Sequence, residues 1–369
     1  LVVIDPLRTI TADAVDEARG DPFLQPLPGT DTALPLAMMH VVVRDGLTDD
    51  AWIAAHTNGF DELRAAVADW TPGRAARLTG LDAHEIESLA VDYATTRPTA
   101  IRTLIGPEHH ENGAMFFRTI ACLPALTGAW ADRGGGLSRS VGWWTEGQID
   151  DAALDRPDLW RHVDGRLPRT VNMSRLGEAL TTPSAGTGAG PGVHALIVWN
   201  CNPLVIVPHA EVVRRGLERD DLFTVVHEQF LTNTARHADI VLPATTQLET
   251  SDVVLPWGHL WVGWNEAAIP PLGESCGNTE LFRRLARAMG YTEPALFDDD
   301  ETLLRQALPT VDLDALRAVG WLRAPYPEDG RPFVDGVFDT ADGRVDLASD
   351  VLEALGQPRV PAFVAPREG

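Results

Sequence analysis

The sequence predicts an α/β protein built on parallel sheets. Short apolar runs alternate with amphipathic helical segments in the order strand, helix, strand, helix. The strand segments are continuously apolar rather than alternating, which is typical of parallel strands covered on both faces. In the clearest unit, residues 194–228, two such strands flank one helical segment, which is a βαβ crossover. Because 369 residues exceed one typical domain, we expect more than one domain of this kind.

Local signals predict the elements of residues 1–140. The Asp82–Glu85 tetrapeptide is a capping box that begins an amphipathic helix, and Pro98 ends that helix. Gly128 is expected to cap a later helix, because a left-handed residue suits a helix C-terminus. The expected elements, in order, are a strand at Leu1–Ile4, a helix at Thr32–Val43 with Leu34, Met38 and Val41 on one face, a helix after Asp82, a strand at Thr99–Ile105 and a helix at Gly113–Leu126.

A loop-rich stretch separates these elements from the βαβ unit. From the glycine run at 134–136 to Gly192 no regular pattern persists, and residues 181–192 are typical of a linker. We therefore expect two domains, 1–140 and 141–369, the second with a loop-rich start at 141–192, a βαβ core at 193–290 and a tail. Its expected elements are strands at His194–Trp199, Leu222–Val226 and Asp239–Leu242 and helices at Ala210–Leu217 and Thr279–Met289, the last with Leu281, Leu285, Ala288 and Met289 facing inward.

Charge and composition argue against several classes of protein. With Lys+Arg 30 and Asp+Glu 53 the net charge is −23, so the chain lacks the basic face that nucleic acids and anionic membranes require. No apolar run approaches the roughly 20 residues that span a bilayer. Three cysteines without a CxxC motif cannot build an iron–sulfur cluster or a structural zinc site. We expect no nucleic-acid partner, no membrane span and, because cysteine is sparse, a cytoplasmic location.

The βαβ unit places polar residues where nucleotides bind in such folds, beyond the carboxyl ends of the strands. Asn200 and Asn202 follow the first strand, and the helix start beside them offers backbone amides for phosphates. Glu228 ends the next strand, as a ribose-binding acid does. No GxGxxG motif is present, so a nicotinamide cofactor is not supported. A plain βαβ layer with an exposed acid stays open as an alternative.

Asp5 repeats this arrangement at the end of the Leu1–Ile4 strand. Arg8 and Thr9 follow, offering a guanidinium and a hydroxyl that suit a phosphate. In the next loop Gly29 allows close approach of the backbone to a ligand, and Asp31 can accept hydrogen bonds from a guanine edge. The alternative is that Thr30 or Asp31 caps the helix that follows.

The remaining candidate residues give weaker evidence for a binding or catalytic site. His109 and His110 are adjacent, so their side chains point in different directions and make a poor metal pair. Two interpretations stay open: one of the two histidines contacts a ligand, or both are ordinary surface residues. Trp257, Trp261 and Trp264 form a strand-like stretch that suits a core or a subunit interface. The sequence contains no nucleophile elbow, no HExxH and no P-loop, so a hydrolase of standard type is not supported.

Taken together, these segments resemble the molybdopterin-dependent oxidoreductases of the dimethyl sulfoxide reductase family. The order and spacing of the matches over nearly the whole chain carry the resemblance, since each match is short. The matching stretches are Val2–Thr9, Pro28–Asp31, Leu123–Gly128, Gly134–Gly136, Trp199–Pro203 and His237–Thr246 with Glu249.

The resemblance implies two Rossmann-like parallel-sheet domains with helices on both faces, the central domains of that family. Family members hold one molybdenum or tungsten between two pterins, each usually extended as a molybdopterin guanine dinucleotide. The implied pocket for one nucleotide tail consists of Asp5, Arg8, Thr9, Gly29, Thr30 and Asp31. The implied pocket for the other consists of Asn200, Asn202, His227 and Glu228. Further implied cofactor contacts are Ile105, Gly106, His109, Thr250 and Asn278.

The resemblance also implies that parts of the family's machinery lie outside this chain. The family's metal ligand, and the cysteines of the 4Fe-4S cluster that many members carry, precede the segment equivalent to Leu1. A C-terminal barrel follows the segment equivalent to Gly369. None of Cys122, Cys201 and Cys276 matches the ligand position, so we expect no metal ligand here. We expect the middle of a longer polypeptide, inactive alone, with any export signal upstream.

The function implied by the resemblance is two-electron or oxygen-atom-transfer chemistry on a small substrate, with an electron-transfer subunit as partner. One alternative is a structural relative in a respiratory complex that has lost the metal. In such a subunit the strand-end acids and the Gly29–Asp31 loop should degrade, and both are present. An unrelated nucleotide-binding module, such as a nicotinamide enzyme, would need a glycine-rich turn that neither Asp5–Thr9 nor Trp199–Pro203 contains.

Overall fold

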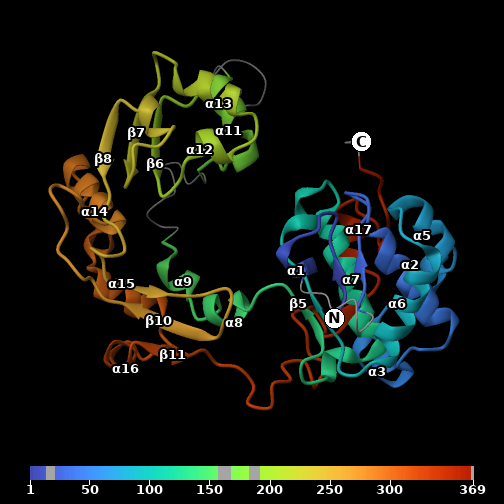
Figure 1. Cartoon of the computed structure of the whole chain (residues 1–369). Coiled ribbons are helices and arrows are strands. Elements are labelled where there is room, and N and C mark those ends of the chain that lie inside the picture. Colours follow the sequence, from blue (N-terminus) through green and yellow to red (C-terminus); the bar gives the residue numbers. More distant parts are fainter. Residues whose placement is uncertain (14–20, 157–167, 183–191, 367–369) are drawn as a thin grey trace. The chain divides into compact units, whose positions relative to one another are not determined.

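A computed structural model describes residues 1–13, 21–156, 168–182 and 192–366 (Figure 1). The chain divides into two compact units. The first unit comprises Leu1–Val141 and Tyr326–Gly369, and the second comprises Gly142–Pro325. The α/β class with parallel sheets is confirmed in both units. The expected linker at 181–192 lies mostly outside the described residues.

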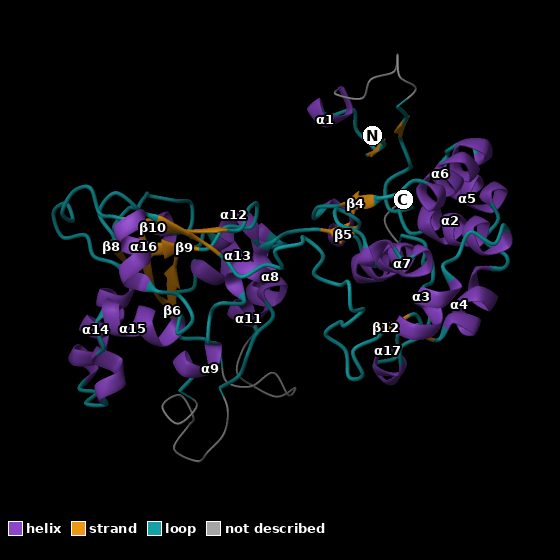
Figure 2. Cartoon of the chain, turned by 90° about the horizontal axis from the view of Figure 1, so that it is seen from below, coloured by secondary structure: helices purple, strands orange, loops and turns teal. Residues whose placement is uncertain are grey.

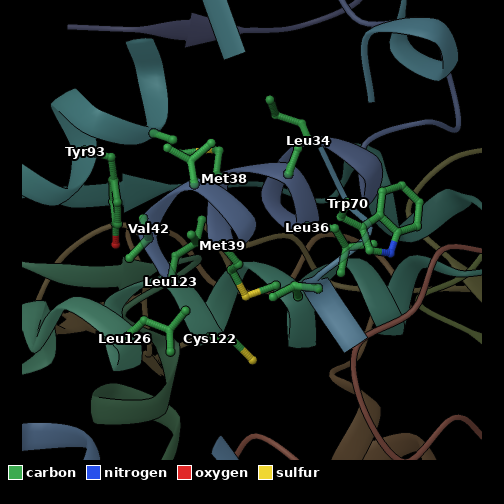
Figure 3. Close-up of a cluster of buried hydrophobic side chains, with 14 of the residues drawn as sticks. Leu34, Leu36, Met38, Met39, Val42, Trp70, Tyr93, Cys122, Leu123 and Leu126 are labelled. Atoms are coloured by element: carbon green, nitrogen blue, oxygen red, sulfur yellow. The ribbon is translucent and has the colours of Figure 1, made fainter. Parts of the chain in front are cut away.

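The core of the first unit surrounds helix α2 (Ala33–Arg44). The sequence predicts one apolar face for this helix, but the structure buries it on nearly all sides, including Leu36 and Met39. A helix that is apolar all round belongs inside a protein. Figure 3 shows its side chains packed against Leu123 and Leu126 of α7. The helices of this core are α3 (Asp50–His56), α4 (Phe60–Val67), α5 (Pro72–Thr79), α6 (Ala83–Thr95) and α7 (Gly113–Thr127).

The predicted helix boundaries are confirmed where a capping signal marks them. The Asp82 carboxylate accepts from the amides of His84 (2.8 Å) and Glu85 (3.3 Å), and the Glu85 carboxylate accepts from the Asp82 amide (3.4 Å). This reciprocal pair is the capping box. Gly128 ends α7 in the left-handed conformation, with φ 70°. Such a residue is the usual C-terminal stop of a helix.

The strands of the first unit form three short parallel pairs. Strand β1 (Val3–Ile4) pairs with β2 (Phe23–Leu24), and β4 (Ala100–Arg102) pairs with β5 (Gly136–Ser138). Both strands predicted from apolar runs are therefore present, but they are shorter than expected. They are also less buried, since Ile4 is 43% exposed. The third pair joins β3 (Thr57–Asn58) to β12 (Val345–Asp346).

The return segment, residues 326–366, packs with the first unit, whereas the sequence predicts that it belongs with 141–325. Strand β12 supplies Leu347, which is fully buried in the first core. Arg118 of α7 donates to the carbonyl oxygens of Pro358 (2.9 Å) and Leu347 (3.4 Å). Burial lowers the pKa of the Arg118 guanidinium, and the Asp346 carboxylate nearby offsets only part of that effect. By its contacts, the return segment is thus part of the first unit, and the two units divide between Val141 and Gly142.

The second unit contains the predicted βαβ core. Strands β6 (Ala195–Trp199), β7 (Phe223–Glu228) and β8 (Ile240–Pro243) form a parallel sheet in that order. Leu196 of β6 faces the cluster of α13 (Ala210–Leu217) and α11 (Leu176–Thr181). Trp199, on the other face, meets Phe282 of α14 (Asn278–Met289) with ring centroids 5.0 Å apart. Helices therefore cover both faces of this sheet, as Figures 1 and 2 show.

The inward face of α14 differs from the prediction. Ala288 and Met289 are exposed, Met289 by 60%, whereas Arg283 and Ala286 are buried. The Arg283 guanidinium donates to the Asp298 carbonyl oxygen (2.7 Å) and pairs with the Asp300 carboxylate (2.5 Å). A basic side chain with such partners can be buried, which an apolar pattern does not reveal.

An antiparallel sheet completes the second unit; of its strands the sequence predicts only the strand-like stretch at Trp257–Trp264, which overlaps the central one. Its order is β11 (Trp321–Arg323), β10 (Trp261–Asn265) and β9 (Asp252–Val254). Helices α15 (Asp300–Ala307) and α16 (Leu313–Val319) contribute to its core. Trp257 is 64% exposed, so a core position for it is wrong. The remaining elements are α1 (Ile10–Asp13), η2 (Gly106–His109), η3 (Ala129–Ala131), α8 (Gly142–Glu146), α9 (Asp151–Leu154), η4 (Met173–Arg175), α12 (Pro203–Ile206), η5 (Ala235–His237), η6 (Pro294–Phe297) and α17 (Asp350–Ala354).

Candidate functional site

The carboxyl edge of the β6–β7–β8 sheet brings together the residues predicted for the second nucleotide pocket. In the strand register Trp199 lies opposite His227, and His227 lies opposite Leu242. The next residue of β7, Glu228, lies opposite Pro243. Asn200 therefore leaves β6 at the level at which Glu228 ends β7. Parallel strands place these ends on one side, which is where the ligands of such sheets bind.

Asn200 and Glu228 are the groups that this edge offers to a ligand. Asn200 adopts the left-handed conformation, φ 52°, which asparagine tolerates better than most residues. Its exposed side chain makes no hydrogen bond within the described part of the chain. Glu228 is half-buried, and one of its oxygens accepts from the Gln229 amide at 2.7 Å. The second oxygen makes no hydrogen bond to the described residues and is available as an acceptor.

Asn202 joins two strand-end loops instead of projecting outward. Its side-chain oxygen accepts from the amide (3.2 Å) and the hydroxyl (2.7 Å) of Thr234, which is fully buried. The Thr234 hydroxyl in turn accepts from the Leu204 amide at 3.1 Å. These bonds tie the loop after β6 to the loop after β7, and so fix where Asn200 and Glu228 lie.

We expect Asn202→Ala to lower the free energy of unfolding by about 1–3 kcal/mol, because it leaves the buried Thr234 donors unsatisfied. Asn200→Gly is the matched control, since glycine accepts the left-handed conformation and the Asn200 side chain makes no hydrogen bond to the described residues. We expect the control to change stability by less than about 0.5 kcal/mol. Urea unfolding of both variants measures the difference. Equal losses would show that Asn202 does not hold the loops together.

His227 is also turned into the protein. It is fully buried, with Nδ1 3.0 Å from the Asn278 amide oxygen and Nε2 3.1 Å from the Cys276 carbonyl oxygen. The structure thus brings together His227 and Asn278, two predicted cofactor contacts that are far apart in sequence. Their side chains contact each other at the start of α14. In this structure the pair supports the strand end that carries Glu228.

The loop after β8 is organised by Glu249, whose role the sequence does not reveal. Its buried carboxylate accepts from the Thr246 amide (2.8 Å) and hydroxyl (2.9 Å) and from the Leu272 amide (2.7 Å). These donors, the Thr246 amide first, hold the pKa of the Glu249 carboxyl below its usual range. Thr250, the predicted contact next to it, donates to the Thr245 hydroxyl at 2.8 Å. Glu249 belongs to the last of the stretches that carry the family resemblance, but only the fold shows that its carboxylate binds Thr246 and the Leu272 amide.

In the first unit Asp5 ends β1 as predicted. One of its carboxylate oxygens accepts from the Leu7 amide at 2.8 Å, and the residue is half-buried. Arg8 pairs with Asp13 at 3.0 Å and lies 5.4 Å from the centre of the Phe23 ring. This ion pair is exposed and therefore weak, so the guanidinium can exchange partners at little cost. Thr9 is exposed next to it.

The Gly29–Asp31 loop leads into the N-terminus of α2. Gly29 has φ +76°, and the Thr30 hydroxyl donates to the Leu27 carbonyl at 2.5 Å. No side chain caps α2, so the alternative that Thr30 or Asp31 is an N-cap is wrong. Within the described residues the Asp31 carboxylate has no hydrogen-bond partner, and it lines a cavity of about 20 Å³. That volume holds about one water molecule.

The other residues of this cavity come from distant segments. Asn112 donates to the Val364 carbonyl oxygen at 3.0 Å, which brings the return segment to the Gly29 loop. His110 lines the cavity, and the predicted cofactor contact of the neighbouring His109 stays a prediction. Ile105, Gly106 and His109 lie exposed at η2, outside the cavity lining.

The described residues offer neither a metal-binding cluster nor a membrane-spanning helix. The histidine, cysteine and acidic side chains of these residues form no group of three or more that could hold a metal ion. None of the helices that the structure describes is both long and apolar enough to cross a membrane.

Comparisons with known proteins place these features in a family. The family model "Molybdopterin oxidoreductase" matches residues 1–288. The probable oxidoreductase YoaE of Bacillus subtilis is 39% identical, with 98% of this chain and 52% of that protein covered. The dimethyl sulfoxide/trimethylamine N-oxide reductase of Rhodobacter capsulatus is 28% identical, with 98% and 49% covered.

A solved structure agrees with the sequence comparisons. Acetylene hydratase from Pelobacter acetylenicus superposes with a TM-score of 0.76 at 25% identity, covering 99% of this chain and 53% of that one. The chain therefore spans about half the length of each of these relatives. It belongs to the molybdopterin oxidoreductases, in the dimethyl sulfoxide reductase family.

Proposed function

We propose that this chain is the central cofactor-binding part of an enzyme that holds molybdenum or tungsten between two molybdopterin guanine dinucleotides. The observation that carries the proposal is the repeated strand-end carboxylate. Asp5 in the first unit and Glu228 in the second each end a parallel strand, half-buried and without a cationic partner among the described residues. A carboxylate can only accept hydrogen bonds, which suits the donors of a guanine edge or a ribose.

The neighbouring groups fit the rest of a nucleotide tail. Gly29, at φ +76°, lets the backbone that leads into α2 approach a phosphate closely, while the first-turn amides of α2 offer little, because those of Ala33 and Leu36 donate to the Thr30 and Thr32 carbonyl oxygens and Pro35 has no N–H. Arg8 is exposed near Asp5 and can pair with a phosphate in place of Asp13. In the second unit Asn200 is exposed next to Glu228 in the strand register. On this proposal Asn202, His227 and Asn278 position these groups and do not contact the nucleotide through their side chains.

When bound, the cofactor would supply two-electron or oxygen-atom-transfer chemistry on a small substrate. The residues of this chain would bind and orient the nucleotide tails. The metal ligand, any 4Fe-4S cluster and the contacts that select the substrate would come from elsewhere in the protein. An electron-transfer subunit is the proposed partner, because electrons have to reach or leave the metal.

Elemental and nucleotide analysis of the full-length gene product tests this function. We expect about one molybdenum or tungsten atom per polypeptide and about two guanine nucleotides released by acid hydrolysis. The second candidate is a structural relative that has lost the metal. The observation that favours it is that the side chains of Asn202, His227 and Asn278 bind other protein groups instead of facing a ligand. Absence of both metal and nucleotide from protein purified after expression with molybdate and tungstate would establish the second candidate instead.

A further inference from the structure

Asn265, the last residue of β10, holds the loop that follows β8. Its side-chain amide donates to the carbonyl oxygens of Gln247 (2.8 Å) and Thr250 (2.7 Å). Because a carbonyl oxygen can only accept, these contacts turn the NH₂ group of Asn265 toward the loop and use both of its protons. Two backbone amides of the segment after β10 donate to the Leu248 carbonyl oxygen (2.8 and 3.0 Å). The antiparallel sheet and the segment that follows it therefore bind three carbonyl oxygens of this loop.

A continuous chain of hydrogen bonds leads from this loop to Glu228. The Thr250 hydroxyl donates to the Thr245 hydroxyl at 2.8 Å. The side-chain amide of Gln229 donates to the Thr245 carbonyl oxygen at 2.8 Å, and the backbone amide of Gln229 donates to the Glu228 carboxylate at 2.7 Å. The main chain joins the same two strand ends, since the Ala244 amide donates to the Glu228 carbonyl oxygen at 3.2 Å. The loop after β8 thus contacts the residues that fix the end of β7.

This support matters because Glu228 has little of its own. Among the described residues its side chain accepts only from the adjacent Gln229 amide, so neighbouring groups have to fix its direction. A carboxylate that is already in place binds a ligand more tightly, because less side-chain freedom is lost on binding. The chain of hydrogen bonds through the loop supplies that order. It begins at Asn265, which lies in the antiparallel sheet and outside the parallel sheet that carries Glu228.

We propose that Asn265 is a positioning residue for the second nucleotide tail, and that the antiparallel sheet is the support of that pocket. This inference rests on the proposed function. Asn265 does not itself contact the nucleotide. It acts through the loop after β8 and through Gln229, which hold Glu228 where its second carboxylate oxygen accepts from the nucleotide.

Asn265→Asp in the full-length protein tests the donor role. The aspartate keeps the shape of the side chain, removes both donors and places a carboxylate against two carbonyl oxygens. We expect guanine nucleotide to be lost on dialysis about three- to tenfold faster than from the wild-type protein, which corresponds to the effect of one hydrogen bond. Asn265→Ala lacks the repulsion and is expected to change the rate in the same direction, so it replaces the aspartate variant if that variant does not fold.

Gln148→Ala is the matched control for loss of a structural amide. Gln148 is half-buried in the same unit, as Asn265 is, and its side chain also makes two hydrogen bonds. It donates to the Trp144 carbonyl oxygen at 3.1 Å and accepts from the Thr310 hydroxyl at 2.9 Å. We expect this variant to unfold at lower urea concentration and to lose nucleotide at the wild-type rate. Equally fast loss of nucleotide from the Gln148 and Asn265 variants would overturn the positioning role, because both would then act through general stability.

Gln229→Ala tests the route from Asn265 to Glu228. Gln229 is exposed, so we expect little change in urea unfolding, but nucleotide loss as fast as from Asn265→Ala. The double variant is expected to lose nucleotide no faster than the single variants, because both act through Thr245. Effects that multiply in the double variant would overturn this route. Wild-type rates in the Asn265 and Gln229 variants would overturn the positioning role and leave the proposed function intact, whereas wild-type protein without guanine nucleotide would overturn both.

Discussion

Glu228→Ala in the full-length protein is expected to weaken retention of the guanine dinucleotide by about 10- to 100-fold. The reason is the loss of charge-assisted hydrogen bonds, each worth about 1.5–3 kcal/mol in a partly buried site. The protein itself should lose little stability, because the only hydrogen bond that Glu228 makes through its side chain to described residues is to the adjacent Gln229 amide. Two measurements separate loss of cofactor from loss of protein stability. The metal and guanine content after extensive dialysis reports the first, and unfolding in urea reports the second.

Glu274→Ala is the matched control for this experiment. Glu274 is exposed in the same unit, and it makes no ion pair or hydrogen bond within the described part of the chain. Both variants remove one negative charge, so a general effect of net charge on anion binding would appear in both. If the Glu228 and Glu274 variants keep the same cofactor content, the strand-end carboxylate does not bind the nucleotide, and the pocket has to be sought elsewhere on the sheet edge.

Local sequence signals were sufficient for the helices that a capping residue marks and for the βαβ core. The capping box at Asp82 and the left-handed Gly128 act within one turn of chain, so their residues alone predict the helix ends. The βαβ unit is also predictable, because two continuous apolar strands with one helix between them have few other arrangements. The candidate strand-end residues follow from that topology, since Asn200 and Glu228 have to share an edge when their strands are parallel neighbours.

The direction in which a side chain points, and the pairing of segments far apart in the sequence, could not be predicted from local signals. Whether His227 points toward a ligand or into the protein depends on Cys276 and Asn278, about fifty residues away. Arg283 is buried because Asp298 and Asp300 satisfy it, and no periodic pattern contains that information. Strand β12 has two residues, too few for a pattern to identify its partner. Each of these features depends on contacts that exist only once the chain has folded.

The return segment supplies the second large effect. Leu347→Ala is expected to lower the free energy of unfolding of the first unit by about 2–5 kcal/mol, because it removes a fully buried side chain from the core around α2. If residues 326–369 belonged to the second domain, the same substitution would instead loosen β6 and β7. Hydrogen exchange resolves the two cases, because protection is measured separately in α2 and in β7.

Leu355→Ala serves as the control, since Leu355 lies in the same segment but is 70% exposed. We expect it to change stability by less than about 0.5 kcal/mol. Loss of protection in α2 and α7 with the Leu347 variant alone would mean that the first unit needs a strand from the far end of the chain. The proposed nucleotide pocket around Asp5 and Gly29 would then form only after residue 345 has been added to β3, because the same segment also reaches Asn112. Unchanged protection in α2 would contradict the packing of Leu347 and with it this dependence.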